Sequence, residues 1–307
     1  IKNILAGLDP RKLAIIGPCS IHDPKAAIEY AKLLNNLHLR LQDKLYIVIR
    51  VYFEKPRTVI GWKGLINDPD LDGSCNMPKG LFLARKLLLD LVDLKIPTAT
   101  EILDPISPQY IGDLLSWASI GARTTESQTH REMASGFSMP VGFKNSTDGS
   151  FEAAVSALEA AKNPHSFIGI DNEGNTAIVR TKGNPWGHII LRGGKTPNYE
   201  PIFVEKAILK LKEKNLLASI MIDCSHANSN KKPENQAFVM KNIIEQINKG
   251  NKNIIGFMLE SNLNAGSQKI PPDLNQLKYG VSVTDACISW QETEQIMQNF
   301  YDSLPNL

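Results

Sequence analysis

Six cationic side chains lie at or just beyond the ends of short apolar runs, where β-strands are predicted. They are Arg50, Lys55, Arg57, Arg123, Lys144 and Arg192. Arginine binds phosphate and carboxylate oxygens in pairs through its planar fork, whereas lysine supplies a compact point charge. Because these cations outnumber what the local carboxylates can neutralise, we expect a substrate set with at least two phosphates and one carboxylate. An ion pair that caps the core explains any one cation equally well. It explains the complete set poorly, because burying many charges without ligands is costly.

A second group of residues joins a thiol, an imidazole and two carboxylates, each from a different segment. Its members are Cys19, His226, Glu260 and Asp285. Such a donor set suits a divalent metal ion, although the spacing contains no short ligand motif. An inert structural cysteine is the simpler interpretation of Cys19 alone. Its position after Gly17-Pro18, a turn that exposes the next side chain, favours a metal ligand.

The composition of the chain disfavours several classes of protein. The 307 residues include 34 basic and 32 acidic side chains, and a net charge of +2 argues against nucleic acid as a partner. No apolar run reaches membrane-spanning length, and the start does not read as a secretion signal. The four cysteines lie far apart without a Cys-x-x-Cys pair, which disfavours a zinc ribbon or a disulfide-stapled fold and indicates a reducing cytoplasm. Since the sequence opens at Ile1 rather than Met, we expect part of an N-terminal segment to be missing.

Short apolar strands alternate with amphipathic helices along almost the whole chain. Strands are predicted at 13–17, 45–51, 98–103, 120–123, 141–144, 188–191, 219–223 and 254–260. Helices are predicted near 24–39, 80–94, 108–118, 130–136, 151–161, 203–214, 234–249 and 291–304. Eight such units in one α/β domain, residues 1–307, favour a (β/α)8 TIM barrel over a doubly wound open sheet. The carboxyl ends of barrel strands converge on one mouth, where catalytic residues lie.

One segment interrupts this alternation. Residues 166–170 and 176–180 are separated by the turn-like stretch 171–174, and together they predict a small β-hairpin inserted before the sixth strand. A hairpin has no role in closing a barrel, so it indicates an added function.

Nine segments resemble the type I 3-deoxy-D-arabino-heptulosonate 7-phosphate (DAHP) synthases of bacteria and fungi. Together they contain the six cations and the four metal-ligand candidates described above. The segments are 17–23, 50–58, 61–69, 121–128, 140–145, 191–195, 223–226, 260–262 and 284–287. They include Lys55-Pro56-Arg57-Thr58 and Asp223-Cys224-Ser225-His226, and the combination is highly specific. The sequence departs from the family pattern at Ser146, where glycine is usual, and at Val59-Ile60, where Thr-Val is usual. Ser146 adds a side chain to a loop at the mouth.

The resemblance implies a transferase, 3-deoxy-7-phosphoheptulonate synthase, that joins phosphoenolpyruvate to D-erythrose 4-phosphate and releases phosphate. This reaction is the first step of the shikimate pathway of aromatic amino acid biosynthesis. The implied metal ligands are Cys19, His226, Glu260 and Asp285, and the implied ion is Mn²⁺, Fe²⁺ or Co²⁺, with Zn²⁺ as an alternative. Phosphoenolpyruvate is implied at Arg50, Lys55, Arg123, Lys144 and Arg192, and erythrose 4-phosphate at Arg57 and Thr58. The candidates for proton transfer are Lys55, Glu101 and His226. A homodimer or homotetramer is expected, with neither nucleic acid nor membrane as partner.

Three other functions remain open at this point. An octulosonate 8-phosphate synthase would use arabinose 5-phosphate instead, but the run from Lys55 to Thr58 looks different in that family. A Schiff-base aldolase would use Lys144 as a nucleophile. A metabolite-sensing barrel without activity is disfavoured, because every expected functional residue is present.

The resemblance also implies feedback inhibition by an aromatic amino acid, and tyrosine is the best candidate. In relatives, the effector cavity lies near such a hairpin and matches Pro108, Gln109, Ser138, Phe167 and Gly169 here. Gly169 resembles the tyrosine-sensitive group and leaves space for a phenolic oxygen, whereas a serine hydroxyl would crowd it. A tight packing point within a strand explains Gly169 about equally well.

Overall fold

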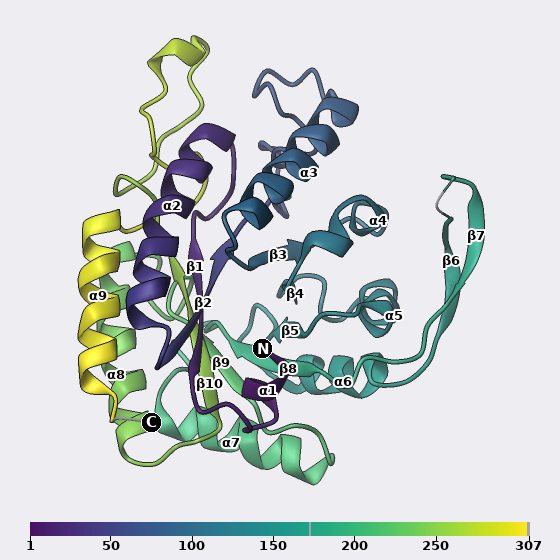
Figure 1. Cartoon of the computed structure of the whole chain (residues 1–307). Helices are drawn as coiled ribbons and strands as arrows, with labels where there is room; N and C mark the ends of the chain where they lie inside the picture. The colour runs from purple at the N-terminus through teal and green to yellow at the C-terminus, as the bar shows by residue number, and fades with distance from the viewer. Residues whose placement is uncertain (172, 306–307) are drawn as a thin grey trace.

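The centre of the computed structural model is a closed barrel of parallel strands (Figure 1), and the residues described are 1–171 and 173–305. Around the barrel the strands follow the order β1-β10-β9-β8-β5-β4-β3-β2. Their bounds are β1 Lys12–Gly17, β2 Leu45–Arg50, β3 Thr98–Ile102, β4 Trp117–Ile120, β5 Val141–Lys144, β8 Gly187–Leu191, β9 Ile220–Asp223 and β10 Ile254–Glu260. The predicted (β/α)8 barrel is therefore confirmed.

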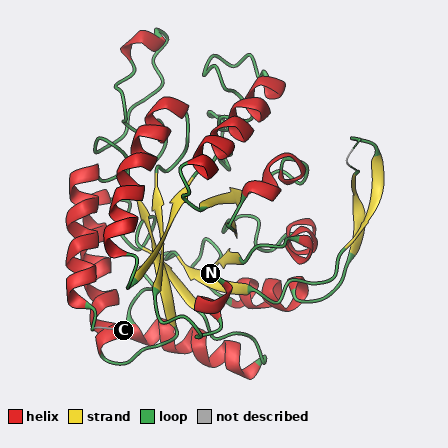
Figure 2. Cartoon of the chain, in the orientation of Figure 1, coloured by secondary structure: helices red, strands yellow, loops and turns green. Residues whose placement is uncertain are grey.

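Helices cover the outside of the barrel, apart from the short α1 at its amino end (Figure 2). They are α1 Lys2–Leu5, α2 Pro24–Leu41, α3 Met77–Asp93, α4 Pro108–Ile111, α5 Gln128–Gly136, α6 Glu152–Ala161, α7 Pro201–Glu213, α8 Gln236–Asn248 and α9 Trp290–Ser303. Helix α2 shows why these segments are helical. Asp23 accepts hydrogen bonds from the backbone N–H groups of Lys25 and Ala26, and Pro24 occupies the first helical position. Its apolar residues at helical spacing, among them Tyr30 and Leu34, are fully buried against the barrel.

The prediction was wrong in the third unit of the barrel. A helix was expected over 108–118 and a strand over 120–123, but α4 is a single turn followed by a 3-10 turn, Gly112–Leu114, and β4 begins at Trp117. Pairing with the neighbouring strands explains the difference. Trp117 pairs with Ala99 of β3, and the N–H of Ala118 donates to the carbonyl of Pro140, which precedes β5. The other predicted elements agree with the structure to within a few residues at their ends.

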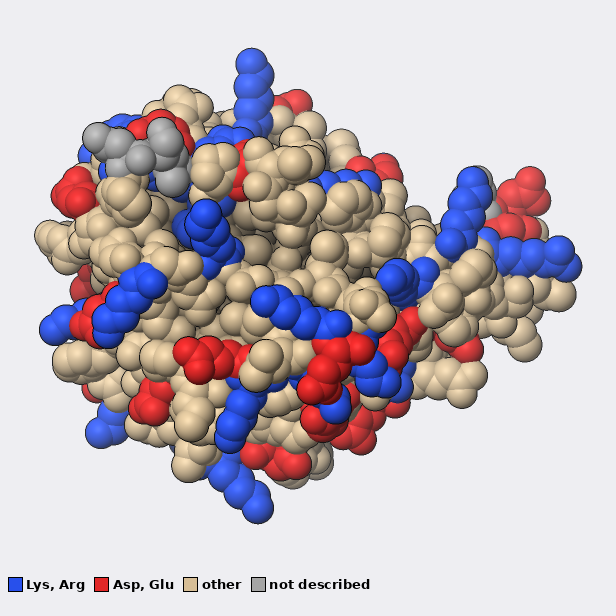
Figure 3. Space-filling view, turned by 90° about the horizontal axis from the view of Figure 1, so that it is seen from below, with Lys and Arg blue, Asp and Glu red and all other residues tan. Residues whose placement is uncertain are grey.

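The amino end of the barrel interior is apolar and closed. Leu13, Ile15, Val48, Trp117, Ile190, Met221 and Met258 form one buried cluster there, and α1 adds Ile4 and Leu5 to the same cluster. Figure 3 views the molecule from below the orientation of Figure 1 and shows Lys and Arg interspersed with Asp and Glu on that surface. An excess of cations is therefore not a property of this face.

The inserted hairpin is confirmed as an antiparallel pair that projects away from the barrel (Figure 1). It consists of β6 Ser166–Ile170 and β7 Thr176–Arg180. Within the predicted turn, 171–174, Asn172 lies outside the described residues, and Gly174 has a φ of +85°. Among the described residues, no helix is both long enough and apolar enough to cross a membrane.

Candidate active site

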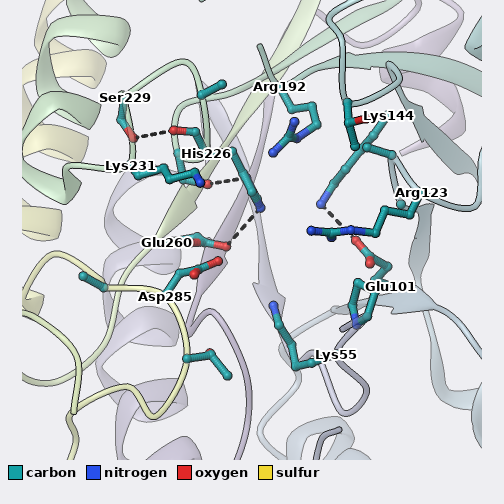
Figure 4. Close-up of a pocket in the computed structure, with 18 of the residues that line it drawn as sticks. Lys55, Glu101, Arg123, Lys144, Arg192, His226, Ser229, Lys231, Glu260 and Asp285 are labelled. Carbon is teal, nitrogen blue, oxygen red and sulfur yellow. Dashed lines mark hydrogen bonds and ion pairs between the residues drawn. The ribbon is translucent and has the colours of Figure 1, made fainter. Parts of the chain in front are cut away.

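A cavity of about 400 Å³ opens at the carboxyl ends of the barrel strands (Figure 4). This mouth cavity has a size ordinary for a small-molecule site. It is lined by three carboxylates, Glu101, Glu260 and Asp285, by His226, and by the seven cations Arg50, Lys55, Arg57, Arg123, Lys144, Arg192 and Lys231. The structure thus brings all six predicted strand-end cations into one cavity. Thr58 is exposed and does not line it.

The turn after β1 places Cys19 beside this cavity. A side chain at Gly17 would put a Cβ 2.6 Å from the carbonyl oxygen of Arg50, so only glycine permits this close approach of β1 to β2. Arg50 also stabilises the turn after β1, because its Nε donates to the carbonyl of Pro18 (3.0 Å) and its Nη2 to the carbonyl of Cys19 (3.3 Å). The side chain of Cys19 is directed by these backbone contacts towards the metal-ligand candidates.

Three of the four predicted metal ligands lie together. One donor atom each from Cys19, Glu260 and Asp285 lies within 4.8 Å of the other two. Nε2 of His226 lies 3.9 Å from Oε1 of Glu260, so the imidazole adjoins this cluster. A thiol, an imidazole and two carboxylates fit a divalent transition-metal ion such as Mn²⁺, Fe²⁺, Co²⁺ or Zn²⁺.

The protonation of these ligands depends on burial and on the surrounding cations. Burial, together with the neighbouring Glu260, raises the pKa of the Cys19 thiol, and Nζ of Lys55 lies 3.2 Å from its sulfur. Burial alone would raise the pKa of Asp285, but Lys55 and His226 hold it below its ordinary value. A positive charge at this cluster would favour the thiolate, as it does at metal-bound cysteines generally.

His226 is held in a strained turn by Asp223. Its backbone is left-handed (φ 55°), a conformation that non-glycine residues adopt at a cost. Oδ1 of Asp223 accepts hydrogen bonds from the N–H and hydroxyl of Ser225 (3.0 and 2.7 Å), and Oδ2 lies 2.9 Å from Nδ1 of His226. The imidazole therefore directs Nε2 towards Glu260 and the cavity.

Lys144 and Glu101 form a buried ion pair on the opposite side of the cavity. Nζ of Lys144 lies 2.9 Å from Glu101 and 3.9 Å from Asp223. Although burial alone would raise the pKa of Glu101, Lys144 and Lys55 lower it to about 2. Burial would lower the pKa of Lys144, but Glu101 and Asp223 raise it above its ordinary value. At neutral pH this pair consists of a carboxylate and an ammonium group.

Several cations in the cavity have no protein counterion. Arg50 pairs with Glu260 (2.7 Å), yet its Nη1 is buried and has no hydrogen-bond partner among the described residues. Within 4.0 Å, no carboxylate of residues 1–171 or 173–305 accompanies Lys55, Arg57, Arg123, Arg192 or Lys231. Unpaired cations facing one cavity are what a polyanionic ligand requires.

Hydrogen bonds close the loop that carries Lys55 and Arg57. The N–H of Lys55 donates to Lys63 and Nε of Arg57 donates to Trp62, both at 2.8 Å. Glu54, in the same loop, is buried and accepts a hydrogen bond from the hydroxyl of Ser107 (2.8 Å). Burial raises the pKa of Glu54 to about 7. The loop is therefore stabilised by hydrogen bonds within itself and by one hydrogen bond to the segment before α4.

Ser146, the departure from the family pattern, forms local contacts in the structure. Its hydroxyl, which has a single proton to donate, lies 2.6 Å from a carboxylate oxygen of Asp148 and 2.9 Å from the carbonyl oxygen of Ser150. The same carboxylate accepts the N–H of Ser150, so the serine closes the loop instead of distorting it.

Two features of the site were missed by sequence reasoning. Lys231 lines the cavity from a loop in which it and Asn230 are both left-handed (φ 59° and 53°), and its place five residues beyond His226 was the available signal. Tyr52 lies beneath the cations with its ring 3.6 Å from the guanidinium of Arg50. In the sequence it is only one aromatic residue just beyond the predicted strand 45–51.

The five predicted effector residues come from three segments. Phe167 and Gly169 lie on β6, Pro108 and Gln109 on α4, and Ser138 follows α5. A Cβ at Gly169 would lie 2.7 Å from Cγ2 of Val179 on β7, so tight packing gives this glycine a reason of its own. The effector site stays a prediction.

Comparisons with known proteins agree with this geometry. Residues 1–298 match the DAHP synthetase I family. The chain is 56% identical over 304 residues to the Tyr-sensitive phospho-2-dehydro-3-deoxyheptonate aldolase of Escherichia coli (strain K12), covering 99% of this chain and 85% of that protein. It is 53% identical to the Phe-sensitive enzyme of the same strain, covering 99% and 87%. It also superimposes on the structure of phospho-2-dehydro-3-deoxyheptonate aldolase from Francisella tularensis SCHU S4 with a TM-score of 0.96 and 50% identity, covering 98% and 88% of the two chains. The chain belongs to the DAHP synthetase I family.

Proposed function

We propose that the mouth cavity condenses phosphoenolpyruvate with D-erythrose 4-phosphate to give DAHP and inorganic phosphate. The observation that carries this function is the charge of the cavity, where seven cations face three carboxylates. Two phosphates and one carboxylate on the substrates match the cations that have no protein counterion. One domain over residues 1–307 would provide the complete site.

Phosphoenolpyruvate is assigned to the inner part of the cavity. Arg50 offers its free, buried Nη1, and the other cations assigned to this substrate face the same cavity, namely Lys55, Arg123, Lys144 and Arg192 (Figure 4). Burial lowers the pKa of Arg192, yet the guanidinium remains charged at neutral pH. Fixed cations hold two mutually repelling anions close together, an orientation effect of several kcal/mol.

Erythrose 4-phosphate is assigned to the loop at the outer part of the cavity. Arg57 lines the cavity with only a backbone carbonyl as its partner, which leaves the other guanidinium nitrogens available for a phosphate. Thr58, the next residue, is exposed and would reach the same phosphate from outside the cavity.

Cys19, His226, Glu260 and Asp285 are assigned as the ligands of a divalent metal ion. When bound, such an ion supplies Lewis acidity that polarises the aldehyde oxygen of erythrose 4-phosphate. Asp223 orients His226, and Arg50 fixes Glu260 through its ion pair. The identity of the ion is left open among Mn²⁺, Fe²⁺, Co²⁺ and Zn²⁺.

In the reaction, C3 of phosphoenolpyruvate forms a bond to the aldehyde carbon, water adds at C2, and cleavage of the C–O bond releases phosphate. Three residues are near enough to the cavity to transfer protons, namely Lys55, Glu101 and His226. Glu101, with a pKa of about 2, is a carboxylate at neutral pH and would orient water or accept a proton.

The Schiff-base alternative is disfavoured by the ion pair of Lys144. A nucleophilic lysine needs a lowered pKa, whereas Glu101 at 2.9 Å raises that of Lys144. Borohydride added together with a carbonyl substrate should therefore leave Lys144 unlabelled. A covalent adduct at Lys144, detected by mass spectrometry, would support the aldolase instead.

A direct assay separates the proposed reaction from that of an octulosonate 8-phosphate synthase. Phosphoenolpyruvate labelled with ¹⁸O in the C–O–P bridge is supplied with either erythrose 4-phosphate or arabinose 5-phosphate. We expect turnover with erythrose 4-phosphate and recovery of the label in inorganic phosphate, because the C–O bond breaks. Preference for arabinose 5-phosphate, or unlabelled phosphate, would contradict the proposal.

We further propose that tyrosine inhibits the enzyme at a site formed by Pro108, Gln109, Ser138, Phe167 and Gly169. The Tyr-sensitive relative and the projecting hairpin support this assignment. Inhibition should be measured with tyrosine, phenylalanine and tryptophan separately, and tyrosine should be the strongest. Gly169→Ser is best tested together with Val179→Ala, because Val179 would otherwise crowd the new side chain. A shift towards phenylalanine supports the site, and stronger inhibition of the unmodified enzyme by phenylalanine contradicts the choice of tyrosine.

A further inference from the structure

Tyr52 lies between the apolar interior of the barrel and the charged cavity. Its side chain is 1% exposed and belongs to the same buried cluster as Trp117 and Met258. It does not line the mouth cavity, so it does not touch a substrate bound there. The ring nevertheless reaches the cationic groups that do line it.

Three cations surround this one ring. The guanidinium carbon of Arg50 lies 3.6 Å from the ring centroid, and the ammonium groups of Lys144 and Lys55 lie 5.5 and 5.8 Å from it. All three distances are within the range in which the negative face of an aromatic ring attracts a cation. Because these contacts are buried, they are stronger than at an exposed surface.

The protein's carboxylates do not neutralise this group completely. Arg50 is paired with Glu260, and Lys144 is paired with Glu101 (2.9 Å) and more distantly with Asp223 (3.9 Å), whereas Lys55 has no carboxylate within 4.0 Å in the part of the chain that the structure describes. The cations therefore repel one another when no substrate is bound. An aliphatic side chain in place of Tyr52 would separate them equally well but would leave this repulsion unchanged.

The side chain of Tyr52 is anchored at its hydroxyl, and its backbone is anchored separately. Its hydroxyl shares a hydrogen bond with Ser119 of β4 (2.9 Å), and its backbone carbonyl accepts the N–H of Ile21 (2.9 Å). A ring held in this way cannot follow the cations, so the cations take their positions from the ring.

We propose that Tyr52 is a positioning residue for the reaction, whose ring face holds Arg50, Lys55 and Lys144 together as one preformed binding site for phosphoenolpyruvate. This inference rests on the proposed function, because it assigns those three cations to phosphoenolpyruvate. It adds a residue outside the cavity that acts through them.

The test replaces Tyr52 with phenylalanine and then with mono-, di- and trifluorinated phenylalanine. Fluorine weakens the negative ring face stepwise while the ring keeps nearly the same shape. The dissociation constant for phosphoenolpyruvate, together with KM and kcat, should be measured for each variant. We expect Tyr52→Phe to stay within about threefold of the unmodified protein, and affinity for phosphoenolpyruvate to fall stepwise to about tenfold weaker with trifluorination. KM for erythrose 4-phosphate should change less.

The matched control is the same fluorinated series at Phe257, a buried ring that packs on Phe300 on the outer side of β10. It should leave both KM values unchanged. A flat series at Tyr52 in an enzyme that is active would overturn the inference while leaving the proposed function intact. An equal loss in Tyr52→Phe and in the fluorinated variants would also overturn it, since the hydroxyl would then carry the effect. Absence of turnover by the unmodified protein would instead contradict the proposed function.

Discussion

At the amino end of the barrel most interior side chains are apolar, whereas two residues further along the same strands they are charged. Because residues two apart in a strand share a face, each pair points into the barrel. The pairs are Val48 and Arg50, Ala99 and Glu101, Ile190 and Arg192, Met221 and Asp223, and Met258 and Glu260. The first members fill a dry core and stabilise the fold. The second members are charged groups, four of them buried and Arg192 half-buried, that tend to destabilise it, and we attribute them to the proposed substrate and metal site.

The largest effect expected at the charged end comes from Lys144→Met. Removal of the ammonium group leaves Glu101 and Asp223 buried without it, which should lower the free energy of unfolding by about 3–5 kcal/mol and abolish activity. The double variant with Glu101→Gln should recover part of the stability and none of the activity. Urea denaturation and the coupled assay measure the two effects. Lys12→Met is the control, because among the described residues Nζ of Lys12 donates only to the carbonyl of Ile254. Equal stability of the single and double variants would contradict the account.

At the apolar end, Ile190→Ala should reduce stability without changing the substrate dependence. Ile190 is fully buried, and such truncations cost about 2–5 kcal/mol. At a temperature at which the variant is folded, both KM values should equal those of the unmodified enzyme. A selective increase in the KM for phosphoenolpyruvate would show that the two ends are not separable.

The two ends should also respond to pH with opposite signs. At the amino end, His188 accepts a hydrogen bond from Trp117 (3.2 Å), and burial lowers its pKa to about 3. Its unfolded form takes up a proton near pH 6.5 and its folded form does not, so stability present above pH 6.5 is lost as the pH falls towards 3. Between pH 6.5 and 5 the loss should be about 2 kcal/mol. His188→Gln should remove it.

Near the mouth, Glu54 has a folded-state pKa raised to about 7. Its unfolded form loses its proton near pH 4.5 and its folded form does not, so stability present below pH 4.5 is lost as the pH rises to 7. The loss should be on the order of 3 kcal/mol. Glu54→Gln should remove it. Unfolding curves of both variants against the unmodified protein, from pH 4.5 to 8, isolate each contribution. For each variant, the difference in unfolding free energy from the unmodified protein is plotted against pH. If the two differences changed with pH in the same direction, the pKa shifts assigned to His188 and Glu54 would be contradicted.

A smaller and more selective effect is expected for Arg57→Ala. Loss of one charge-assisted contact should raise the KM for erythrose 4-phosphate by about 10- to 150-fold, equivalent to roughly 1.5–3 kcal/mol. The KM for phosphoenolpyruvate should change far less. Arg11→Ala, at the amino end and paired with Asp9, should change neither value. A larger increase in the KM for phosphoenolpyruvate than in that for erythrose 4-phosphate would instead assign Arg57 to phosphoenolpyruvate.

The smallest effect is expected for Ser146→Gly. The glycine loses the hydrogen bonds to Asp148 and Ser150 and gains conformational freedom in the unfolded chain, so stability should fall by about 1 kcal/mol. Activity should stay within about twofold. Thermal denaturation measures the first effect, and a large loss of activity would show that this loop does more than close on itself.

The sequence predicted the charged end of the barrel well because strand ends can be located from the apolar runs that precede them. Strand four was misplaced, since Trp117 and Ala118 continue an apolar pattern that also suits a helix, and only pairing with β3 and β5 decides between the two. Tyr52 was missed because its role depends on the distances from its ring to Arg50, two residues earlier, and to Lys144 at the end of β5. Lys231 was missed because its approach to the cavity depends on two consecutive left-handed residues, which its place five residues beyond His226 did not by itself predict.

We propose that the charged end of the barrel binds a metal ion and two anionic substrates for one reaction. The decisive measurement is DAHP formation from phosphoenolpyruvate and erythrose 4-phosphate after treatment with a chelator and after addition of Mn²⁺. We expect activity to disappear with the chelator and to return with Mn²⁺, and Cys19→Ala to remain folded, bind less metal and stay inactive. Full activity of the metal-free protein, or a fully active Cys19→Ala variant with bound metal, would contradict the account.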